Sequence, residues 1–358
     1  MTRFRELYRA MELPVFQNKM FHSIQAARDC AKGDVLLVQD LETGLIFNRA
    51  FRPELMQYDA DYQNEQAESP AFRSHLLKMS NVVSRHFWGH SLLEVGCGKG
   101  RFLEQLQAIG FEITGFDPAY EGSNTAIIKD YFRPETGLRA NGIILRHVLE
   151  HVQDPVGFLS SIRDANGGSG KIYIEVPCFD WICTHRSWVD IFYEHVNYFR
   201  LPDFYRMFGV VHEAGHTFGE QYLYVVADLA TLKSPAHDVT DKVDFPSDFL
   251  RPVSEYAERV KGKAADPDLP PAIWGAASKG VIFALFMQRA GARIDLVIDI
   301  NPAKQGKYLA STGLQVQSPS AAMDRLPWGA DLFVMNSNYL NEIQQLAGSR
   351  FNYLLVEQ

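Results

Sequence analysis

A glycine-rich turn between an apolar strand and a helix could hold a nucleotide-like ligand. The strand, residues 92–95, carries Glu94, and a second strand, residues 112–116, is followed by Asp117. Three glycines lie in the turn: Gly96, Gly98 and Gly100. Glycines let the backbone approach a ligand closely, and the start of the next helix supplies free N–H donors. An acid after the second strand is suited to bond the hydroxyls of a ribose.

The spacing of the glycines distinguishes between two possible ligands, NAD and S-adenosylmethionine. No glycine stands at the third position of the G-x-G-x-x-G dinucleotide fingerprint, so NAD is the weaker interpretation. The pattern E-x-G-x-G-x-G resembles the first motif of class I methyltransferases, which use S-adenosylmethionine (AdoMet). That resemblance implies that Glu94 bonds the methionine amino group, that the glycines make room for methionine and ribose, and that Asp117 bonds the ribose. A glycine turn without a ligand is the remaining alternative.

Later segments fit the same interpretation. Asp130 follows an apolar run, where such folds place a residue beside adenine; a solvated turn acid is the alternative. His147 follows the predicted strand 143–145, at the edge where open α/β sheets bind ligands, and is expected near the cofactor and the reacting methyl group. His151 has a structural explanation as a histidine at a helix start.

A titratable pair in aromatic surroundings follows the fifth strand, residues 171–176. The pair is Glu194 and His195, and the aromatic residues around it are Phe192, Tyr193, Tyr198 and Phe199. Such surroundings perturb pKa values and favour acid–base chemistry. An exposed pair in a loop is the alternative.

The order of these motifs resembles the sugar C-methyltransferases that act on nucleotide-linked 4-keto deoxysugars, and their natural-product relatives. The matching segments are residues 62–69, 175–177, 192–199, 274–280 and 299–307. The resemblance implies that His195 is the general base that removes a proton next to a carbonyl and that Glu194 orients it. It also implies that Tyr62 and His147 contact the substrate's oxygens.

Three further residues are candidates for substrate binding. Tyr193 and Tyr198 belong to the aromatic segment, and Lys279 offers a cation suited to an anionic group. The C-terminal part of the chain is expected to help close over the substrate.

The chain departs from that family at several positions. Residues 38–45 resemble a zinc knuckle with both cysteines replaced, by Asp40 and Thr43, and Cys30 stands alone, so no zinc is expected. The eleven histidines form no H-E-x-x-H arrangement, and His147 with His151 has no third ligand in sequence, so no metal is expected. Phe192, Tyr193 and Trp274 replace a tyrosine, a histidine and a tyrosine, which weakens the nucleotide-sugar assignment more than the methyltransferase assignment.

The alternation of strands and helices predicts an α/β protein with three parts. Residues 1–70 form a small N-terminal lobe, and residues 71–233 form a Rossmann-like class I methyltransferase domain with a mostly parallel sheet. Residues 234–358 form a second Rossmann-like α/β domain on the substrate side, in which a strand, a small-residue turn, a helix and a strand ending on Asp299 repeat the nucleotide-type half-fold.

Composition excludes other classes. The net charge of -8, without a lysine or arginine cluster, argues against nucleic acid as a partner. No apolar run is long enough to span a bilayer, and no secretory signal is recognised at the N-terminus. The four cysteines are scattered, so a cytoplasmic location is expected.

The leading hypothesis is therefore an AdoMet-dependent methyltransferase that forms a C–CH₃ bond on an enolisable, carbonyl-bearing small molecule and releases S-adenosylhomocysteine. One alternative is an O- or N-methyltransferase acting on a small metabolite. Another is a methyltransferase-like module that binds without turnover.

Overall fold

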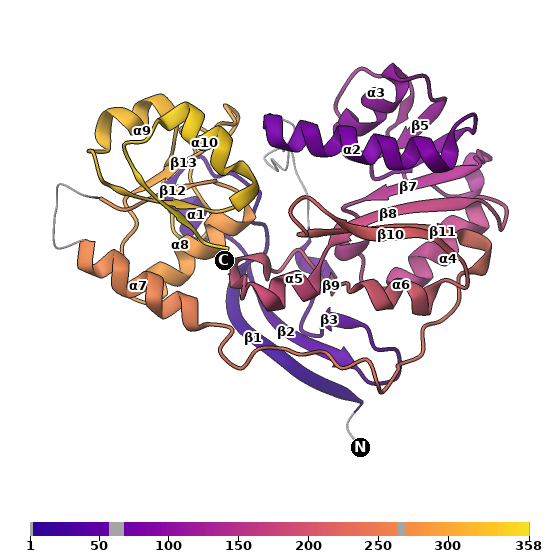
Figure 1. The fold of residues 1–358 in the computed structure, drawn as a ribbon, viewed down its shortest axis with the longest axis horizontal. Helices are drawn as coiled ribbons and strands as arrows, with labels where there is room; N and C mark the ends of the chain where they lie inside the picture. Colours follow the sequence, from indigo (N-terminus) through magenta and orange to yellow (C-terminus); the bar gives the residue numbers. More distant parts are fainter. Residues whose placement is uncertain (1–2, 57–67, 264–269, 358) are drawn as a thin grey trace.

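Three β-sheets organise the chain: one of four strands, one of seven and one of five. The computed structural model describes residues 3–56, 68–263 and 270–357. In Figure 1 the five-stranded sheet and its helices lie on the left, the seven-stranded sheet lies on the right, and strands β1 and β2 run below them. The expected fold class, α/β with a Rossmann-like unit and additional α/β regions, is confirmed.

The seven-stranded sheet has the order β10-β11-β8-β7-β4-β5-β6. Its strands are β4 (Leu92–Val95), β5 (Ile113–Phe116), β6 (Ile127–Ile128), β7 (Gly142–Arg146), β8 (Lys171–Pro177), β10 (Val211–Thr217) and β11 (Tyr222–Asp228). Strands β8, β7, β4, β5 and β6 run parallel to one another. Strand β11 pairs antiparallel with both β8 and β10. The strand order reverses between β4 and β7, which opens a crevice at their carboxyl ends.

Helices cover this sheet on both faces. They are α2 (Pro70–Phe87), α3 (Arg101–Ala108), α4 (Pro155–Ala165), α5 (Phe179–Thr184) and α6 (Leu201–Met207). Helix α2 begins where its sequence provides a cap, because the Ser69 hydroxyl accepts a hydrogen bond from Phe72 N and Pro70 needs no partner for a backbone N–H. Within the described ranges, no helix combines the length and the apolar character needed to cross a membrane.

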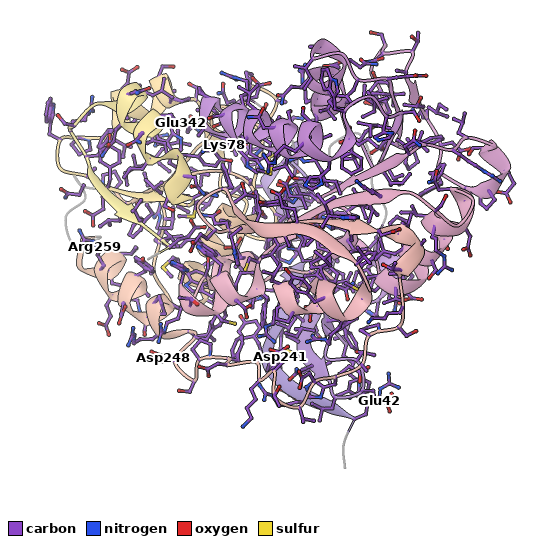
Figure 2. The ribbon with its side chains drawn as sticks, turned by 45° about the vertical axis from the view of Figure 1, so that its right-hand side comes forward. Glu42, Lys78, Asp241, Asp248, Arg259 and Glu342 are labelled. Atoms are coloured by element: carbon purple, nitrogen blue, oxygen red, sulfur yellow. The ribbon has the colours of Figure 1, made fainter. Side chains whose placement is uncertain are left out.

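The five-stranded sheet is entirely parallel, in the order β14-β13-β12-β15-β16. Its strands are β12 (Ala272–Trp274), β13 (Leu296–Ile298), β14 (Val316–Gln317), β15 (Asp331–Val334) and β16 (Asn352–Leu355). Its helices are α7 (Arg251–Lys263), α8 (Ser278–Arg289), α9 (Pro319–Arg325) and α10 (Leu340–Ala347). Arg259, on the outer helix α7, pairs with the buried Asp331 at 2.7 Å (Figure 2). The order of this sheet reverses between β12 and β15, so a second crevice opens there.

The N-terminal lobe completes its sheet with a strand from the middle of the chain. It consists of β1 (Phe4–Pro14), α1 (Ile24–Arg28), β2 (Lys32–Asp40) and β3 (Ile46–Asn48), and β9 (Asn197–Tyr198) pairs with β3. Its knuckle-like turn is held by Asp40, whose carboxylate accepts hydrogen bonds from Glu42 N at 2.9 Å and from the Arg3 guanidinium at 2.7 Å. The division into three domains at residues 70 and 233 stays a prediction.

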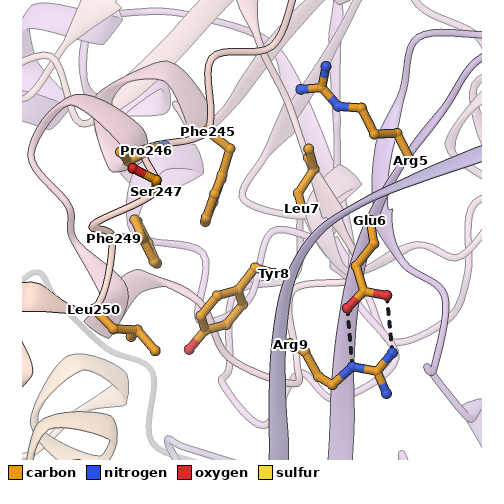
Figure 3. A pocket seen from close by; sticks show the side chains of 10 residues that line it. All are labelled: Arg5, Glu6, Leu7, Tyr8, Arg9, Phe245, Pro246, Ser247, Phe249 and Leu250. Carbon is orange, nitrogen blue, oxygen red and sulfur yellow. Dashed lines mark hydrogen bonds and ion pairs between the residues drawn. The ribbon is translucent and has the colours of Figure 1, made fainter.

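An aromatic joint connects β1 to the segment that links the two α/β units. The ring of Tyr8 contacts that of Phe249, with 5.4 Å between their centroids, and Phe245 lies beside them (Figure 3). Glu6 and Arg9 pair on the exposed side of the same strand. The linking segment is therefore packed against the N-terminal lobe.

One ion cluster on the edge strand β10 gives the stability of this fold a measurable pH dependence. Although burial opposes it, hydrogen bonds from His86, Arg85 and Tyr224 hold the pKa of Glu213 at about 2, below its ordinary 4.5. A lowered pKa stabilises the fold fully above pH 4.5, and this contribution is lost as the pH falls toward 2.

We expect Glu213→Gln to lower the free energy of unfolding at neutral pH by about 1–2 kcal/mol, allowing for solvent screening of a partly exposed group. The difference from the unmodified protein should vanish as the pH approaches 2. Urea denaturation at a series of pH values measures it. A difference that does not change with pH would contradict this origin.

Candidate active site

One cavity of about 1470 Å³ lies between the two α/β units. The turns after β4 and β7 line it from one side, and Trp274, Asp299 and Asn336 line it from the other. The parallel strands of both sheets therefore present their carboxyl ends to the same space. Pockets for a single small ligand measure roughly 300–1,000 Å³, so this cavity has room for two molecules to meet.

The cavity brings together most of the residues predicted from the sequence. Those that line it are Glu94, Gly96, Gly98, Asp117, Asp130, His147, Glu194, His195 and Lys279. Among the described residues, Gly100, Tyr193 and Tyr198 are not part of its lining. Tyr62 lies outside the described residues.

The glycine turn has the geometry that a closely approaching ligand requires. Gly98 has a φ of +54°, and a Cβ atom there would meet no atom within 4 Å, so its backbone faces open space. Gly96 has a φ of +73°, and a Cβ there would lie 2.4 Å from Val148 Cγ2. Gly100 lies behind the turn as the N-terminal cap of α3. A side chain at Gly98 would occupy the ligand's space, whereas one at Gly96 would clash with the protein.

Glu94 is a buried acid whose carboxyl group is not fully hydrogen-bonded by the described residues. It is 2% exposed, and its Oε2 has no hydrogen-bond partner among the described residues. Burial raises the pKa of Glu94 to about 8, although the positive charge of Arg146 opposes the shift. A cationic group bound beside this carboxyl would favour its ionised form.

Two further predicted acids, Asp117 and Asp130, line the cavity near the glycine turn. The carboxylate of Asp117 accepts hydrogen bonds from Gly98 N and Ala119 N, both at 2.8 Å. Burial raises the pKa of Asp117, and these two bonds lower it. A carboxylate can accept about four hydrogen bonds, so Asp117 can take two more. Asp130 is exposed at the rim and accepts a hydrogen bond from Tyr131 N.

A buried network beneath the cavity was not identified from the sequence. Glu175, at the end of β8, is fully buried and is bonded by four side chains. They are His75 (2.7 Å), Tyr173 (2.8 Å), Arg146 (3.0 Å) and His147 (3.2 Å). Burial would raise the pKa of Glu175, but Arg146 and the two histidines hold it well below its usual value. The only sequence signal was the E-V-P strand end.

His147 is held between two carboxylates. Its Nε2 lies 3.2 Å from Glu175, and its Nδ1 lies 3.3 Å from Glu150 Oε1. Burial lowers the pKa of His147, but these bonds outweigh that effect and raise it to about 9. His147 also has a φ of +51°, a conformation that is costly without a glycine and occurs often at functional sites. It therefore places a fixed positive charge on the cavity wall.

His195 has a different environment. Its ring packs on Phe192 with a centroid distance of 4.1 Å, and the ring of His151 lies 5.0 Å away. Burial holds the pKa of His195 well below its ordinary value, and the neighbouring charges of His151, His147 and Lys279 add to this effect. Because this pKa is low, the imidazole is neutral at neutral pH and one of its ring nitrogens has a lone pair. No described residue forms a hydrogen bond with either ring nitrogen.

Glu194 ties two parts of the site together. Its carboxylate accepts a hydrogen bond from Gln17 N at 2.6 Å, and its carbonyl oxygen accepts one from His151 Nδ1 at 2.8 Å. Glu194 thus links the lead-in segment of the N-terminal lobe to the turn after β7.

The two predicted substrate tyrosines bond the protein backbone. The hydroxyl of Tyr193 accepts a hydrogen bond from Arg52 N at 2.8 Å, and that of Tyr198 accepts one from Phe192 N at 3.2 Å. Both are buried where the segment 191–199 joins the N-terminal sheet. Their contact with a substrate stays a prediction.

Lys279 lies at the contact between the two α/β units. Its Nζ pairs with Glu357 and lies 3.1 Å from Asp190, beneath the ring of Trp181. Two carboxylates therefore already balance the charge of Lys279, which was predicted to bind an anionic group. A second contact joins the units at the edge of the cavity, where Glu342 of α10 accepts a hydrogen bond from Ser69 Oγ at 2.7 Å (Figure 2).

Comparison with known proteins finds a family match, two similar proteins and similar solved structures. Residues 50–216 match the family described as a methyltransferase domain. The C-methyltransferase NovU of Streptomyces niveus is 24% identical over 71% of this chain and 68% of that protein. The mitochondrial ubiquinone biosynthesis O-methyltransferase of Homo sapiens is 27% identical over 29% of this chain and 34% of that protein. The solved structure of the PH0226 protein from Pyrococcus horikoshii aligns with 48% of this chain and 99% of its own, with 13% identity and a TM-score of 0.38.

The Glu175 network predicts a large stability effect from a small substitution. Glu175→Gln keeps the shape but leaves the largely buried Arg146 without its counter-charge and His147 with only one of its two carboxylates, so we expect a loss of about 3–5 kcal/mol in the free energy of unfolding. Tyr173→Phe removes one neutral donor from the same carboxylate and should cost about 1–2 kcal/mol. Chemical denaturation compares them, and equal losses would show that the charge is not what matters.

Proposed function

Because this protein is an AdoMet-dependent methyltransferase of class I, we propose that it methylates a carbon atom of an enolisable, carbonyl-bearing small molecule, with His195 as the general base. The observation that carries the proposal is that a neutral imidazole with a free lone pair lines the same cavity as the glycine turn. The C-methyltransferase from Streptomyces niveus, which aligns with most of this chain, supports carbon as the acceptor.

The residues around the glycine turn fit AdoMet. The unpartnered Oε2 of Glu94 would accept a hydrogen bond from the methionine amino group, and the open space at Gly98 would admit the methionine and ribose. Asp117 would bond the ribose hydroxyls, and Asp130 at the rim would lie beside adenine. AdoMet, when bound, supplies an electrophilic methyl group and leaves as neutral S-adenosylhomocysteine.

The chain's own residues would prepare the acceptor. His195 takes the proton from the carbon next to the carbonyl, and the electron pair of that C–H bond becomes the enolate. The fixed positive charge of His147 stabilises the enolate oxygen, and Tyr62 is the proposed second contact of the substrate's oxygens. The enolate carbon then forms the new bond to the methyl group. Room for both molecules in one cavity allows the alignment that this step needs.

The size of the cavity supports the proposed substrate class. A nucleotide-linked keto-deoxysugar, or another natural-product intermediate of similar size, would extend from His195 toward the C-terminal unit, which we assign to the substrate side, with Tyr193, Tyr198 and Lys279 as the predicted binding residues. The protein would act on this small molecule in the cytoplasm. The alternative is methylation of oxygen or nitrogen. The similarity to a human O-methyltransferase supports oxygen as the acceptor in that case.

The test uses AdoMet with a trideuterated methyl group, incubated with the protein and candidate keto-deoxysugar nucleotides or a metabolite extract. Mass spectrometry detects the labelled product, and its fragmentation distinguishes C–CH₃ from O–CH₃ or N–CH₃. A parallel incubation in D₂O without AdoMet measures how fast the proton on the carbon next to the carbonyl is replaced by deuterium. Only carbon methylation requires the loss of this proton. A labelled methyl on oxygen or nitrogen would overturn the proposal, and no label with AdoMet bound would favour a binding module.

We expect His195→Ala to lower turnover by roughly 100-fold or more and to abolish C–H exchange, since a positioned base contributes about that much. The affinity for AdoMet should stay within twofold, because the glycine turn and Asp117 lie on other segments. His216→Ala, at an exposed position on β10, is the matched control. Turnover that survives in His195→Ala would exclude this residue as the base.

The raised pKa of Glu94 predicts that AdoMet binding releases a proton. Below its pKa of about 8 the free protein holds Glu94 protonated, and pairing with an ammonium group requires the carboxylate. Affinity should therefore rise between about pH 6 and pH 7.5, by at most tenfold per unit. Calorimetry in buffers of different ionisation enthalpy counts the released proton. Glu94→Gln should bind more weakly without this pH dependence, and an unchanged dependence would place the proton elsewhere.

A further inference from the structure

Three side chains with metal-ligand chemistry converge on the cavity wall. Glu150, His151 and His195 each place a donor atom within 4.8 Å of the donors of the other two. Glu150 and His151 belong to the short turn after β7, whereas His195 belongs to the segment before β9. Two imidazoles and one carboxylate form a donor set that suits Zn²⁺ and neighbouring transition metals. No third ligand for His151 was predicted from the sequence, and the fold brings Glu150 and His195 close to it.

The tautomer of His151 leaves the right nitrogen free. Its Nδ1 lies 2.8 Å from the carbonyl oxygen of Glu194, and a carbonyl oxygen can only accept. Nδ1 therefore carries a proton, and Nε2 is the nitrogen that remains to bind a metal. A metal-ligating histidine commonly has its second nitrogen fixed by a carbonyl or carboxylate in this way.

Glu150 provides an independent observation. It is 1% exposed, and its Oε1 lies 3.3 Å from His147 Nδ1. Its Oε2 is buried and has no hydrogen-bond partner among the described residues. A buried carboxylate oxygen without a partner costs free energy, which a bound cation would recover.

Hydrogen bonds fix the two segments relative to each other. Val196 N donates to the carbonyl oxygen of Glu150 at 2.7 Å, and the amide side chain of Asn197 donates to the carbonyl of Val152. The donors from the turn and from the following segment are thus held together without a metal. All three line the cavity, so further coordination positions would be open to water or a ligand.

We propose that Glu150, His151 and His195 form a binding site for a transition-metal dication such as Zn²⁺ or Co²⁺. Mg²⁺ prefers oxygen ligands and is not expected to bind there. A second part of the proposal rests on the proposed function. The cation uses the same imidazole that serves as the base, so the protein with metal bound does not catalyse methyl transfer.

The binding test uses the full chain after treatment with a chelator and titrates it with Co²⁺, which is followed by its visible absorption. We expect one equivalent to bind, and we expect His151→Ala and Glu150→Gln each to weaken binding by at least about tenfold. Circular dichroism checks that both variants fold. His216→Ala should bind Co²⁺ like the unmodified protein, and Mg²⁺ should not compete. Unchanged Co²⁺ affinity in both variants, or no binding by the unmodified protein, would overturn the site.

The second part is tested by turnover of the metal-free protein as Zn²⁺ or Co²⁺ is added. Methyl transfer should fall in proportion to occupancy and return when a chelator removes the metal. Turnover that rises with occupancy would overturn the blocking role and the base role of His195 together. If the metal-free protein transfers no methyl group while Co²⁺ binds as expected, the proposed function fails and the metal site stands.

Discussion

The buried carboxylate of Glu175 is the interaction on which the site depends. Its four partners come from α2, from β7 and the turn after it, and from β8 itself, so one acid joins the elements around the cavity floor. Its charge helps to keep Arg146 and His147 ionised at the cavity wall. Arg146 in turn acts on Glu94, and His147 contacts Glu150. The cofactor side and the substrate side therefore share one electrostatic network.

The parallel strands of two sheets face each other across the cavity, and this arrangement brings two crevices into one site. Each sheet alone would provide one crevice at its point of strand reversal. Polar contacts between the units, among them Lys279 with Asp190 and Glu342 with Ser69, keep the two crevices open toward a common space. Apolar packing adds to these contacts, because the ring of Trp188 stacks on that of Phe283 in α8, with 5.8 Å between their centroids.

The strand–turn–helix around Glu94 and Asp117 could be predicted because its signal is local: an apolar run, glycines and an acid at short spacing. The fold class and the methyltransferase assignment followed from this and similar motifs, and both are confirmed. The partners of Glu175 could not be predicted, because strand order brings them together from distant parts of the sequence. The tyrosines of the segment 191–199 were chosen for their aromatic surroundings, but pairing of β9 with the N-terminal lobe turned their hydroxyls toward backbone atoms. The individual site roles stay predictions.

The pairing of β3 with β9 also sets the order in which the chain can fold. Strand β3 cannot pair with β9 until the ribosome has added about 150 more residues. By then most of the seven-stranded sheet has been synthesised. The first part of the chain to be made is thus among the last to be completed, and such long-range pairing slows folding. Until then β3 presents an unpaired edge, the kind of surface on which nascent chains associate wrongly. The same pairing makes the N-terminal lobe inseparable from the segment that carries His195, so neither can be removed or exchanged without exposing the other.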